Sequence, residues 1–442
     1  MPDTQLAGLT AIEAAARIAA GDVSAEDYVG ACLARIAASD DKVRAFVHLD
    51  PQDALRQARA RDEERRNGKA LGPLHGVPVA IKDIFDTANY PTECGSTLFK
   101  GRQPARDCTA VARLREAGAV IIGKTVTTEC AYFHPGPTRN PHDLERTPGG
   151  SSSGSAAAVA AGMVPLAVGS QTNGSVIRPA SFCGVYGIKP THGTISRHGA
   201  LILSKALDHV GVFARTLPDA ALILAALAGY DENDSDTRPL AAPKYLETLQ
   251  EVPPQPPRLA FVRTPMWDKA DAETREAFEA LAKRLEDCVA AVDLPDAYAA
   301  AWDDQRVIMY TDMAHNFGAL VVRGGEASSQ QLRDLVAEGS RTNALRYLAA
   351  RDNAPVYAAG LNEIFKRFDA ILTPSTPGIA PRGMATGNPV FNTLWSLTGL
   401  PAVTLPLLSG EGGMPIGVQL VGAAGDDARL LRTANWLVGR LA

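Results

Sequence analysis

The chain has 442 residues, of which 46% are hydrophobic, so it can bury a large core and is not a disordered protein. Its formal net charge is −5, and its 44 basic and 49 acidic residues are intermixed, which leaves no basic block for nucleic acid. Six cysteines without a CxxC pair predict neither a zinc site nor a disulfide framework.

The first 24 residues carry acidic side chains and lack a basic segment followed by an apolar one, so they do not resemble a secretion signal. Further along, no uninterrupted apolar run reaches the ~18 residues that a membrane-spanning helix needs. These patterns predict a soluble cytoplasmic protein without a membrane partner.

Residues 1–68 are predicted to form a helical flank beside a sheet. Residues 9–20 have apolar positions at helical spacing, and Gly21 follows as a C-cap. Ser24 and Asp27 have the spacing of a capping box for a helix that runs to about Ala38. The pair Asp50-Pro51 begins a third helix, which ends at Asn67-Gly68.

Residues 76–86, GVPVAIKDIFD, are predicted to form a buried strand that carries Lys82. Burial of a lysine costs free energy unless the amine is paired or neutral. Lys82 is therefore either an edge-strand lysine whose amine reaches solvent or a base with a lowered pKa. A helix over residues 109–117 and a strand over 119–122 follow.

Two clusters rich in glycine and serine, residues 149–155 and 169–175, lie within the segment 148–190. Between them, residues 156–162 favour a helix and the apolar run 164–168 favours a buried strand. A loop–helix–strand–loop order can bring both clusters together and supply hydroxyls and backbone N–H groups for catalysis. The alternative is that both clusters are ordinary turns.

The remaining chain alternates further helices and strands. Residues 231–257 are polar and proline-rich, which predicts a surface excursion, and residues 298–351 have a mostly helical pattern without a motif. Helices are predicted over 217–227, 272–285 and 428–441, and strands over 259–262, 289–294, 370–372, 402–406 and 416–421.

Several motifs together make the chain resemble the amidase signature family. They are VAIKDIFDT, AGAVIIGKT, TPGGSSSGSAAAVAAGMVPLAVGS, TNGSVIRPASFCGVYGIKPT, GLPAVTLPL and MPIGVQLVG. The resemblance covers most of residues 71–215, the catalytic signature region, and returns from about residue 368 to the C-terminus. It implies one α/β/α domain over residues 1–442, in which helices cover both faces of a central mixed sheet. The alternation of helices and short strands further predicts that the sheet is mostly parallel.

The resemblance also implies a mechanism, because enzymes of this family hydrolyse amides with a Ser–cis-Ser–Lys triad and an acyl-enzyme intermediate. It implies that Ser175 is the nucleophile, Ser151 the bridging cis-serine and Lys82 the base, and it calls for neither a metal nor an organic cofactor. The family's oxyanion hole and its supporting hydroxyl map onto Thr172, Asn173, Gly174 and Ser175, and onto Ser152.

Two shorter motifs point to other functions. Residues 118–125, GAVIIGKT, fit the phosphate-loop pattern, but a predicted strand fills the pattern and no helix follows it. Residues 150–154, GSSSG, fit the nucleophile elbow of α/β-hydrolases with Ser152 as nucleophile, but the residues upstream are polar. The eight histidines are scattered, and we assign none of them a catalytic role.

Arg178 bears on the choice of substrate. It stands three residues after Ser175, and this variant most resembles the malonamidase-like branch of the family, in which the matching arginine can bind a substrate carboxylate. The alternative is a structural ion pair that holds the loop. Tyr132 and Phe133, in the loop 132–141, either line a substrate pocket or pack as loop residues.

The resemblance leaves the substrate open, since related enzymes also cleave aryl amides, ureas and carbamates, including urethanes. The expected partner is a small-molecule amide or carbamate, and assembly as a homodimer stays open. Residues 298–351 correspond to the part of the family that shapes the substrate pocket. The rival prediction is the glutaminase subunit of a tRNA-dependent amidotransferase complex, against which the Arg178 spacing and the short chain argue.

Overall fold

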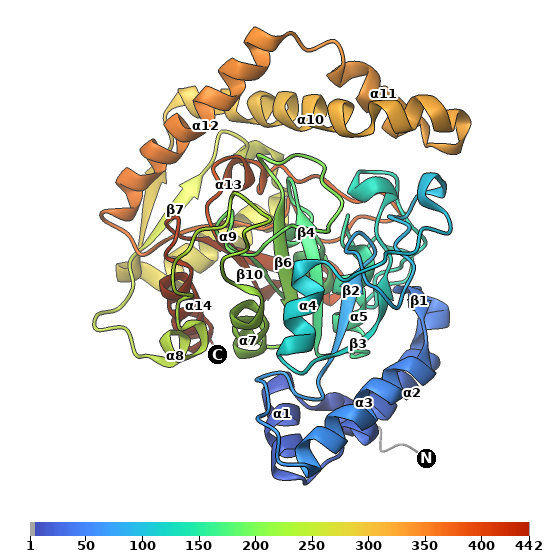
Figure 1. Ribbon diagram of the computed structural model, residues 1–442. Helices are drawn as coiled ribbons and strands as arrows, with labels where there is room; N and C mark the ends of the chain where they lie inside the picture. The colour runs from blue at the N-terminus through green and yellow to red at the C-terminus, as the bar shows by residue number, and fades with distance from the viewer. Residues whose placement is uncertain (1–4, 442) are drawn as a thin grey trace.

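A mixed sheet of 11 strands runs through residues 5–441, the part of the chain that the computed structural model describes (Figure 1). Its strand order is β1-β3-β2-β4-β6-β5-β10-β11-β9-β7-β8. The strands are β1 Phe46–Leu49, β2 Pro78–Lys82, β3 Val120–Thr125, β4 Leu166–Gln171, β5 Tyr186–Lys189, β6 His209–Ala214, β7 Leu259–Arg263, β8 Val289–Asp293, β9 Ala370–Pro374, β10 Ala402–Ser409 and β11 Pro415–Val421.

The prediction of a mostly parallel sheet is wrong, although the sheet is mixed as expected. Among the described strands, six neighbouring pairs are antiparallel and four are parallel. Parallel neighbours need a long crossover, whereas a short connection returns the chain antiparallel. The short link from β10 to β11 therefore makes a hairpin, and β1, β5 and β6, which the sequence patterns did not reveal, add further antiparallel pairs.

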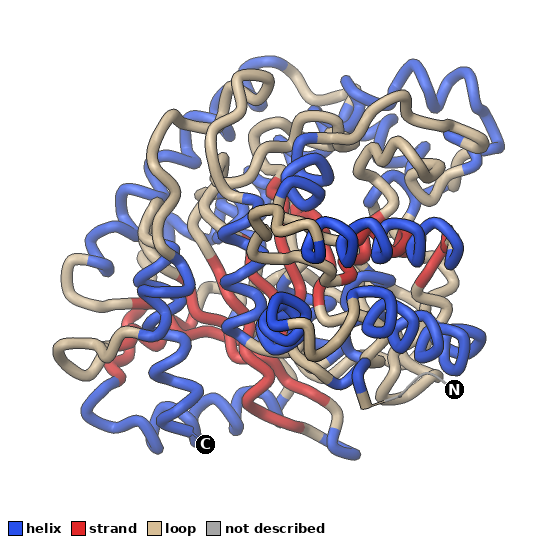
Figure 2. Tube along the Cα trace, turned by 60° about the horizontal axis from the view of Figure 1, so that its bottom comes forward, coloured by secondary structure: helices blue, strands red, loops and turns tan. Residues whose placement is uncertain are grey.

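Helices cover both faces of this sheet, which forms a twisted band through the middle of the molecule in Figure 2. On one face α5 and α6 pack against the central strands, and on the other α4, α7 and α14 do so. The helices are α1 Ala11–Ala20, α2 Ala25–Val43, α3 Pro51–Arg66, α4 Thr109–Glu116, α5 Ser153–Ala160, α6 Ile177–Cys183, α7 Leu217–Leu227, α8 Tyr245–Gln250, α9 Ala272–Leu285, α10 Ala301–Gly324, α11 Gln330–Gly339, α12 Ala344–Phe365, α13 Thr393–Leu397 and α14 Asp427–Leu441.

Successive residues of one strand point to opposite faces, and this alternation divides the core in two. In β2, Val79 and Ile81 belong to the larger core cluster, whereas Ala80 belongs to the cluster under α5. Small residues such as Ala80 suit the α5 face, because that helix is itself mostly alanine and serine and packs close to the sheet. This close packing holds the two glycine- and serine-rich clusters next to the end of β2.

The caps predicted for the N-terminal helices are confirmed. Gly21 ends α1 in the left-handed conformation. Ser24 caps α2 by accepting the Asp27 N–H, without the return bond between the Asp27 side chain and the Ser24 N–H that would complete the predicted capping box, and the helix runs five residues beyond the predicted end at Ala38, to Val43. Asp50 caps the start of α3, and the helix ends at Arg66, directly before Asn67. These three helices lie together at the bottom of the view in Figure 1.

Helices α10, α11 and α12 form a layer above the body of the molecule, at the end opposite the N-terminal helices (Figure 1). They account for the predicted helical region 298–351. The polar segment 231–257 carries the short helix α8, whose Tyr245 and Leu249 are buried. No helix within residues 5–441 is long and apolar enough to cross a membrane.

Candidate active site

The candidate site lies where two parallel neighbours, β2 and β4, end at the same edge of the sheet. Lys82 is the last residue of β2, and the loop 172–175 follows the end of β4 at Gln171. Ser151 and Ser152 immediately precede α5, which packs on both strands. The crevice beyond the carboxyl ends of strands is the usual place for ligands in open α/β sheets.

Lys82 is wholly buried and held by hydroxyl groups. Its Nζ lies 2.7 Å from Ser151 Oγ and 2.8 Å from Ser170 Oγ. Burial lowers the pKa of Lys82 to about 7, against an opposing effect of the Asp208 carboxylate. The edge-strand interpretation is wrong, because β2 lies between β3 and β4 and the amine has no access to solvent.

The peptide bond between Gly150 and Ser151 is cis, as the resemblance implies. Next to it, Ser152 is buried, and its Oγ accepts a hydrogen bond from the Ser170 N–H at 3.2 Å. Ser170 therefore joins Lys82 to Ser152. Sequence reasoning gave Ser170 no role, although its place in the glycine- and serine-rich cluster 169–175 is a signal that could have found it.

The backbone around Ser175 offers unpaired donors. Within the described structure, the N–H groups of Asn173, Gly174 and Ser175 donate to no protein acceptor. Nearly all buried backbone N–H groups in proteins are paired, so three consecutive free donors next to a hydroxyl are suited to hold a negatively charged oxygen. Ser175 itself is half-buried.

Buried polar groups hold this loop from several sides. The Gln171 carboxamide oxygen accepts the N–H groups of Val176 and Ile177 at 2.8 and 3.0 Å. Thr172 donates its hydroxyl to Asp208 at 2.6 Å. Burial raises the pKa of Asp208 to about 6, while this hydrogen bond opposes the rise. Sequence reasoning missed Asp208, which stands in no recognised motif.

Ser151 and Ser175 line one small pocket, with a cavity of about 20 Å³. Tyr132 and Phe133 also line this pocket, and their contact with substrate stays a prediction. The Tyr132 hydroxyl donates to Tyr310 on α10 at 2.9 Å. The other lining residues are Ala131, Thr172, Asn173, Arg178, Leu203 and Met309.

Arg178 is buried in the wall of this pocket without a carboxylate. Its Nη2 donates to the Gly150 carbonyl at 2.7 Å, and its guanidinium lies 5.8 Å from the centre of the Phe133 ring. Its Nε and Nη1 have no hydrogen-bond partner, and burial lowers its pKa to about 9. The expected structural ion pair is wrong, since no acidic group of the described chain lies within reach.

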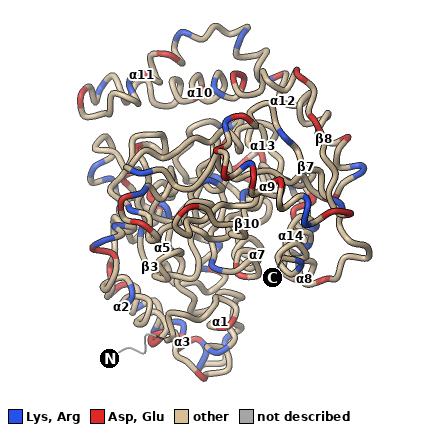
Figure 3. Tube along the Cα trace, turned by 180° about the vertical axis from the view of Figure 1, so that it is seen from behind, with Lys and Arg blue, Asp and Glu red and all other residues tan. Residues whose placement is uncertain are grey.

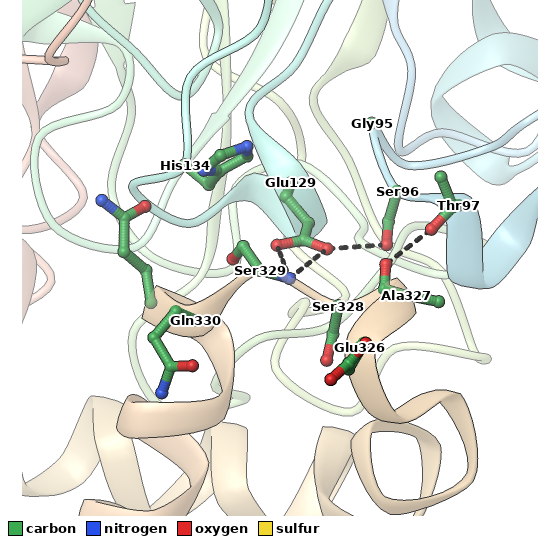
Figure 4. A pocket seen from close by; sticks show the side chains of 11 residues that line it. Gly95, Ser96, Thr97, Glu129, His134, Glu326, Ala327, Ser328, Ser329 and Gln330 are labelled. Atoms are coloured by element: carbon green, nitrogen blue, oxygen red, sulfur yellow. Dashed lines mark hydrogen bonds between the residues drawn. The ribbon is translucent and has the colours of Figure 1, made fainter.

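A second, wider pocket (Figure 4) is lined by residues 95–97, Glu129, His134 and 326–331. Glu129 is the first residue of a 3-10 turn, Glu129–Ala131, whose last residue faces the Ser175 pocket. The Glu129 carboxylate accepts the Ser96 hydroxyl at 3.0 Å and the Ser329 N–H at 3.1 Å. It thus fastens the start of α11 to the pocket wall.

Comparison with known proteins agrees with this geometry, which is suited to acyl transfer. The family model Amidase matches residues 27–431. A glutamyl-tRNA(Gln) amidotransferase subunit of Chloroflexus aurantiacus is 35% identical, over 98% of this chain and 96% of its own length.

Solved structures give the same result. A chain of the vestigial protein complex that reveals the origins of an s-triazine catabolic enzyme is 32% identical, with a TM-score of 0.90 and 98% of each chain covered. Native peptide amidase from Stenotrophomonas maltophilia is 31% identical, with a TM-score of 0.87 over 99% of this chain and 98% of its own. The chain belongs to the amidase family, and its fold is that of the amidase-signature enzymes.

Proposed function

We propose that the protein is an amidohydrolase in which Ser175 attacks the amide carbonyl and Lys82 acts as the base through Ser151. The observation that supports this most is the 2.7 Å contact between Lys82 Nζ and Ser151 Oγ, in a buried site that also contains Ser175. A lysine with a pKa near 7 is in part neutral at neutral pH, as a general base must be.

The proposed reaction has two halves. Ser175 Oγ attacks the carbonyl carbon as its proton passes to Ser151 Oγ, and the Ser151 proton passes to the neutral Lys82 amine. The oxyanion is held by backbone N–H groups of the loop 172–175, of which those of residues 173–175 are free. Lys82 then returns a proton through Ser151 to the leaving nitrogen, the C–N bond breaks, and water hydrolyses the acyl-enzyme.

We further propose that the substrate carries a carboxylate on its acyl side. Two nitrogens of Arg178 lack partners and lie in the pocket wall, where an uncompensated guanidinium is costly to bury. A substrate carboxylate would supply the missing acceptor, and Arg178 lines the same pocket as Ser175, which favours a carboxylate near the scissile carbonyl. Short dicarboxylic monoamides fit, and ureas or carbamates that carry a carboxylate share the same acyl-transfer step.

A fluorophosphonate tests the nucleophile. We expect one adduct per chain, on the peptide that contains Ser175, and none in Ser175→Ala. The Ser175→Ala variant should also lose hydrolysis of malonamate. An adduct on Ser152 would instead support the α/β-hydrolase interpretation and contradict ours.

Arg178→Gln tests the substrate class on a matched pair, malonamate and the neutral malonamide. A charge-assisted hydrogen bond contributes roughly 1.5–3 kcal/mol, so kcat/KM for malonamate should fall about 10- to 100-fold. The value for malonamide should change much less. Equal losses on both substrates, together with a lower Tm, would show that Arg178 only braces the loop through Gly150.

The amidotransferase relatives favour a second candidate, the glutaminase subunit of a tRNA-dependent amidotransferase complex, since one such subunit is similar over nearly the whole chain. The same acyl-transfer step would then release ammonia from glutamine for a partner protein. The assay is ammonia release from glutamine by the chain alone and with the other amidotransferase subunits of the same organism. Glutamine turnover that needs those other subunits would favour this candidate over a free-standing amidase.

A further inference from the structure

Helix α10 reaches the loop 172–175 through the buried side chain of Gln305. Gln305 is only 1% exposed. Its Nε2 donates to the Thr172 carbonyl at 3.4 Å, and its Oε1 accepts from Asn173 Nδ2 at 3.2 Å. One carboxamide therefore contacts two consecutive residues of the loop that holds the free N–H groups.

The other face of Asn173 is held by α13. Thr393 Oγ1 donates to Asn173 Oδ1 at 2.9 Å, and Ser396 Oγ donates to the Asn173 carbonyl. Asn173 thus lies between α10 and α13, which pack against each other. Since both polar atoms of the Asn173 side chain take part in this bracing, we assign the side chain a structural role and not contact with substrate.

The same face of α10 also lines the Ser175 pocket. Met309 lies one turn after Gln305, in contact with the Gln305 Nε2 through its sulfur at 3.6 Å, and it forms part of the pocket wall. The next residue, Tyr310, accepts a hydrogen bond from Tyr132, which also lines the pocket. A shift of α10 that accommodates an acyl group would therefore move Gln305 and, with it, the loop.

We infer that Gln305 is a positioning residue, which sets the backbone N–H groups of residues 173–175 for the oxyanion and couples their placement to the pocket wall on α10. This inference rests on the proposed amidohydrolase function. An uncharged carboxamide satisfies both contacts, because the Thr172 carbonyl needs a donor and the Asn173 amide needs an acceptor. A carboxylate of the same shape would place two acceptors against each other.

Gln305→Glu and Gln305→Leu test the inference, with malonamate as substrate. Misplacement of oxyanion donors typically costs about 10²-fold or more in rate, so we expect kcat of Gln305→Leu to fall at least about tenfold while KM stays within about twofold. In Gln305→Glu the buried carboxyl group has a raised pKa and is protonated at lower pH, where it can donate to Thr172 as glutamine does.

The pH profile of Gln305→Glu is the decisive readout. We expect its kcat, relative to the wild type, to decline as pH rises and the carboxyl group ionises, which adds a basic limb that the wild type lacks. A residue that only stabilised the fold would not create this limb. A kcat within twofold of the wild type in Gln305→Leu, or a Gln305→Glu profile parallel to that of the wild type, would overturn the inference.

Asp304→Asn is the matched control. Asp304 is the neighbouring residue on α10, is similarly buried, and faces α12, where it accepts from Arg346, Asn353 and Tyr357. We expect this variant to lower Tm and to leave the shape of the pH profile unchanged. If Ser175→Ala keeps activity, the proposed function fails, whereas inactive Ser175→Ala with fully active Gln305 variants refutes the role of Gln305 alone.

Discussion

Lys82 illustrates how the environment of a single residue can prepare a base. In water a lysine is charged at neutral pH, with a pKa of about 10.4. Here the amine is buried between the Ser151 and Ser170 hydroxyls, and its pKa falls to about 7. Hydroxyl groups can accept from the charged amine and donate to the neutral one, so the site tolerates either form during proton transfer.

The rate of hydrolysis should therefore depend on the Lys82 proton. We expect kcat/KM to rise with pH through about 7 and to level off above it, because only the neutral amine accepts a proton. Lys82→Arg keeps the charge but cannot deprotonate, so its activity should fall nearly as far as that of Lys82→Ala, by more than about 10³-fold. Substantial activity in Lys82→Arg would exclude the role as a base.

The same lowered pKa affects stability. Between pH 10.5 and about 7 the unfolded chain binds a proton on Lys82 that the folded chain does not. The contribution of Lys82 to the free energy of unfolding therefore falls as the pH decreases across that window. Lys82→Met lacks this effect. Chemical unfolding measured at about pH 7 and about pH 9.5 gives the free energy of unfolding of both proteins. The difference between them should shift in favour of the variant as the pH is lowered to about 7, by about 1.4 kcal/mol per pH unit at most. A pH-independent difference would show that Lys82 keeps its ordinary pKa.

At the scale of an element, strand β3 shows how a segment can match the phosphate-loop pattern without forming a phosphate-binding loop. Most of the residues that match the pattern form β3, an interior strand between β1 and β2, and Lys124 is wholly buried. Its Nζ lies 3.1 Å from an Asp83 carboxylate oxygen and donates to the Phe85 carbonyl and the Thr92 hydroxyl. The lysine that a nucleotide would need is thus part of the core.

Lys124→Ala should be a stability variant. Removal of one partner from a buried ion pair typically costs about 3–5 kcal/mol, so the free energy of unfolding should drop by that order. Hydrolysis by the folded variant should stay within a few-fold of the wild type, and ATP should not raise the Tm of the wild-type protein. ATP-dependent stabilisation would reopen the nucleotide interpretation, because any ligand of the folded state stabilises it.

For the whole molecule, charge decides which partners are disfavoured. Acidic and basic positions are interspersed along the chain in Figure 3, and the formal net charge is −5. Binding to nucleic acid draws mainly on clustered lysine and arginine side chains that neutralise phosphates. We therefore expect no change in the fluorescence anisotropy of a labelled tRNA at micromolar protein and about 50 mM salt. Saturable binding that weakens with salt would contradict this and favour the amidotransferase candidate.

The sequence by itself determined the features that depend on neighbouring residues. The caps at Ser24 and Asp50 use residues two or three positions apart, so their pattern is visible along the chain. The family motifs likewise predicted that Lys82 and Ser151 lie together, and the structure places them in contact. The role of this pair in catalysis stays a prediction.

Only the tertiary structure decided the features that join distant parts of the chain. Strand direction depends on which strands become neighbours, so six antiparallel pairs could not be inferred from the alternation of helices and strands. Whether Arg178 meets a carboxylate depends on packing, and the burial that leaves its Nε and Nη1 without partners has no sequence signal. Gln305 lies far along the chain from Thr172, and only the packing of α10 brings its carboxamide to that loop.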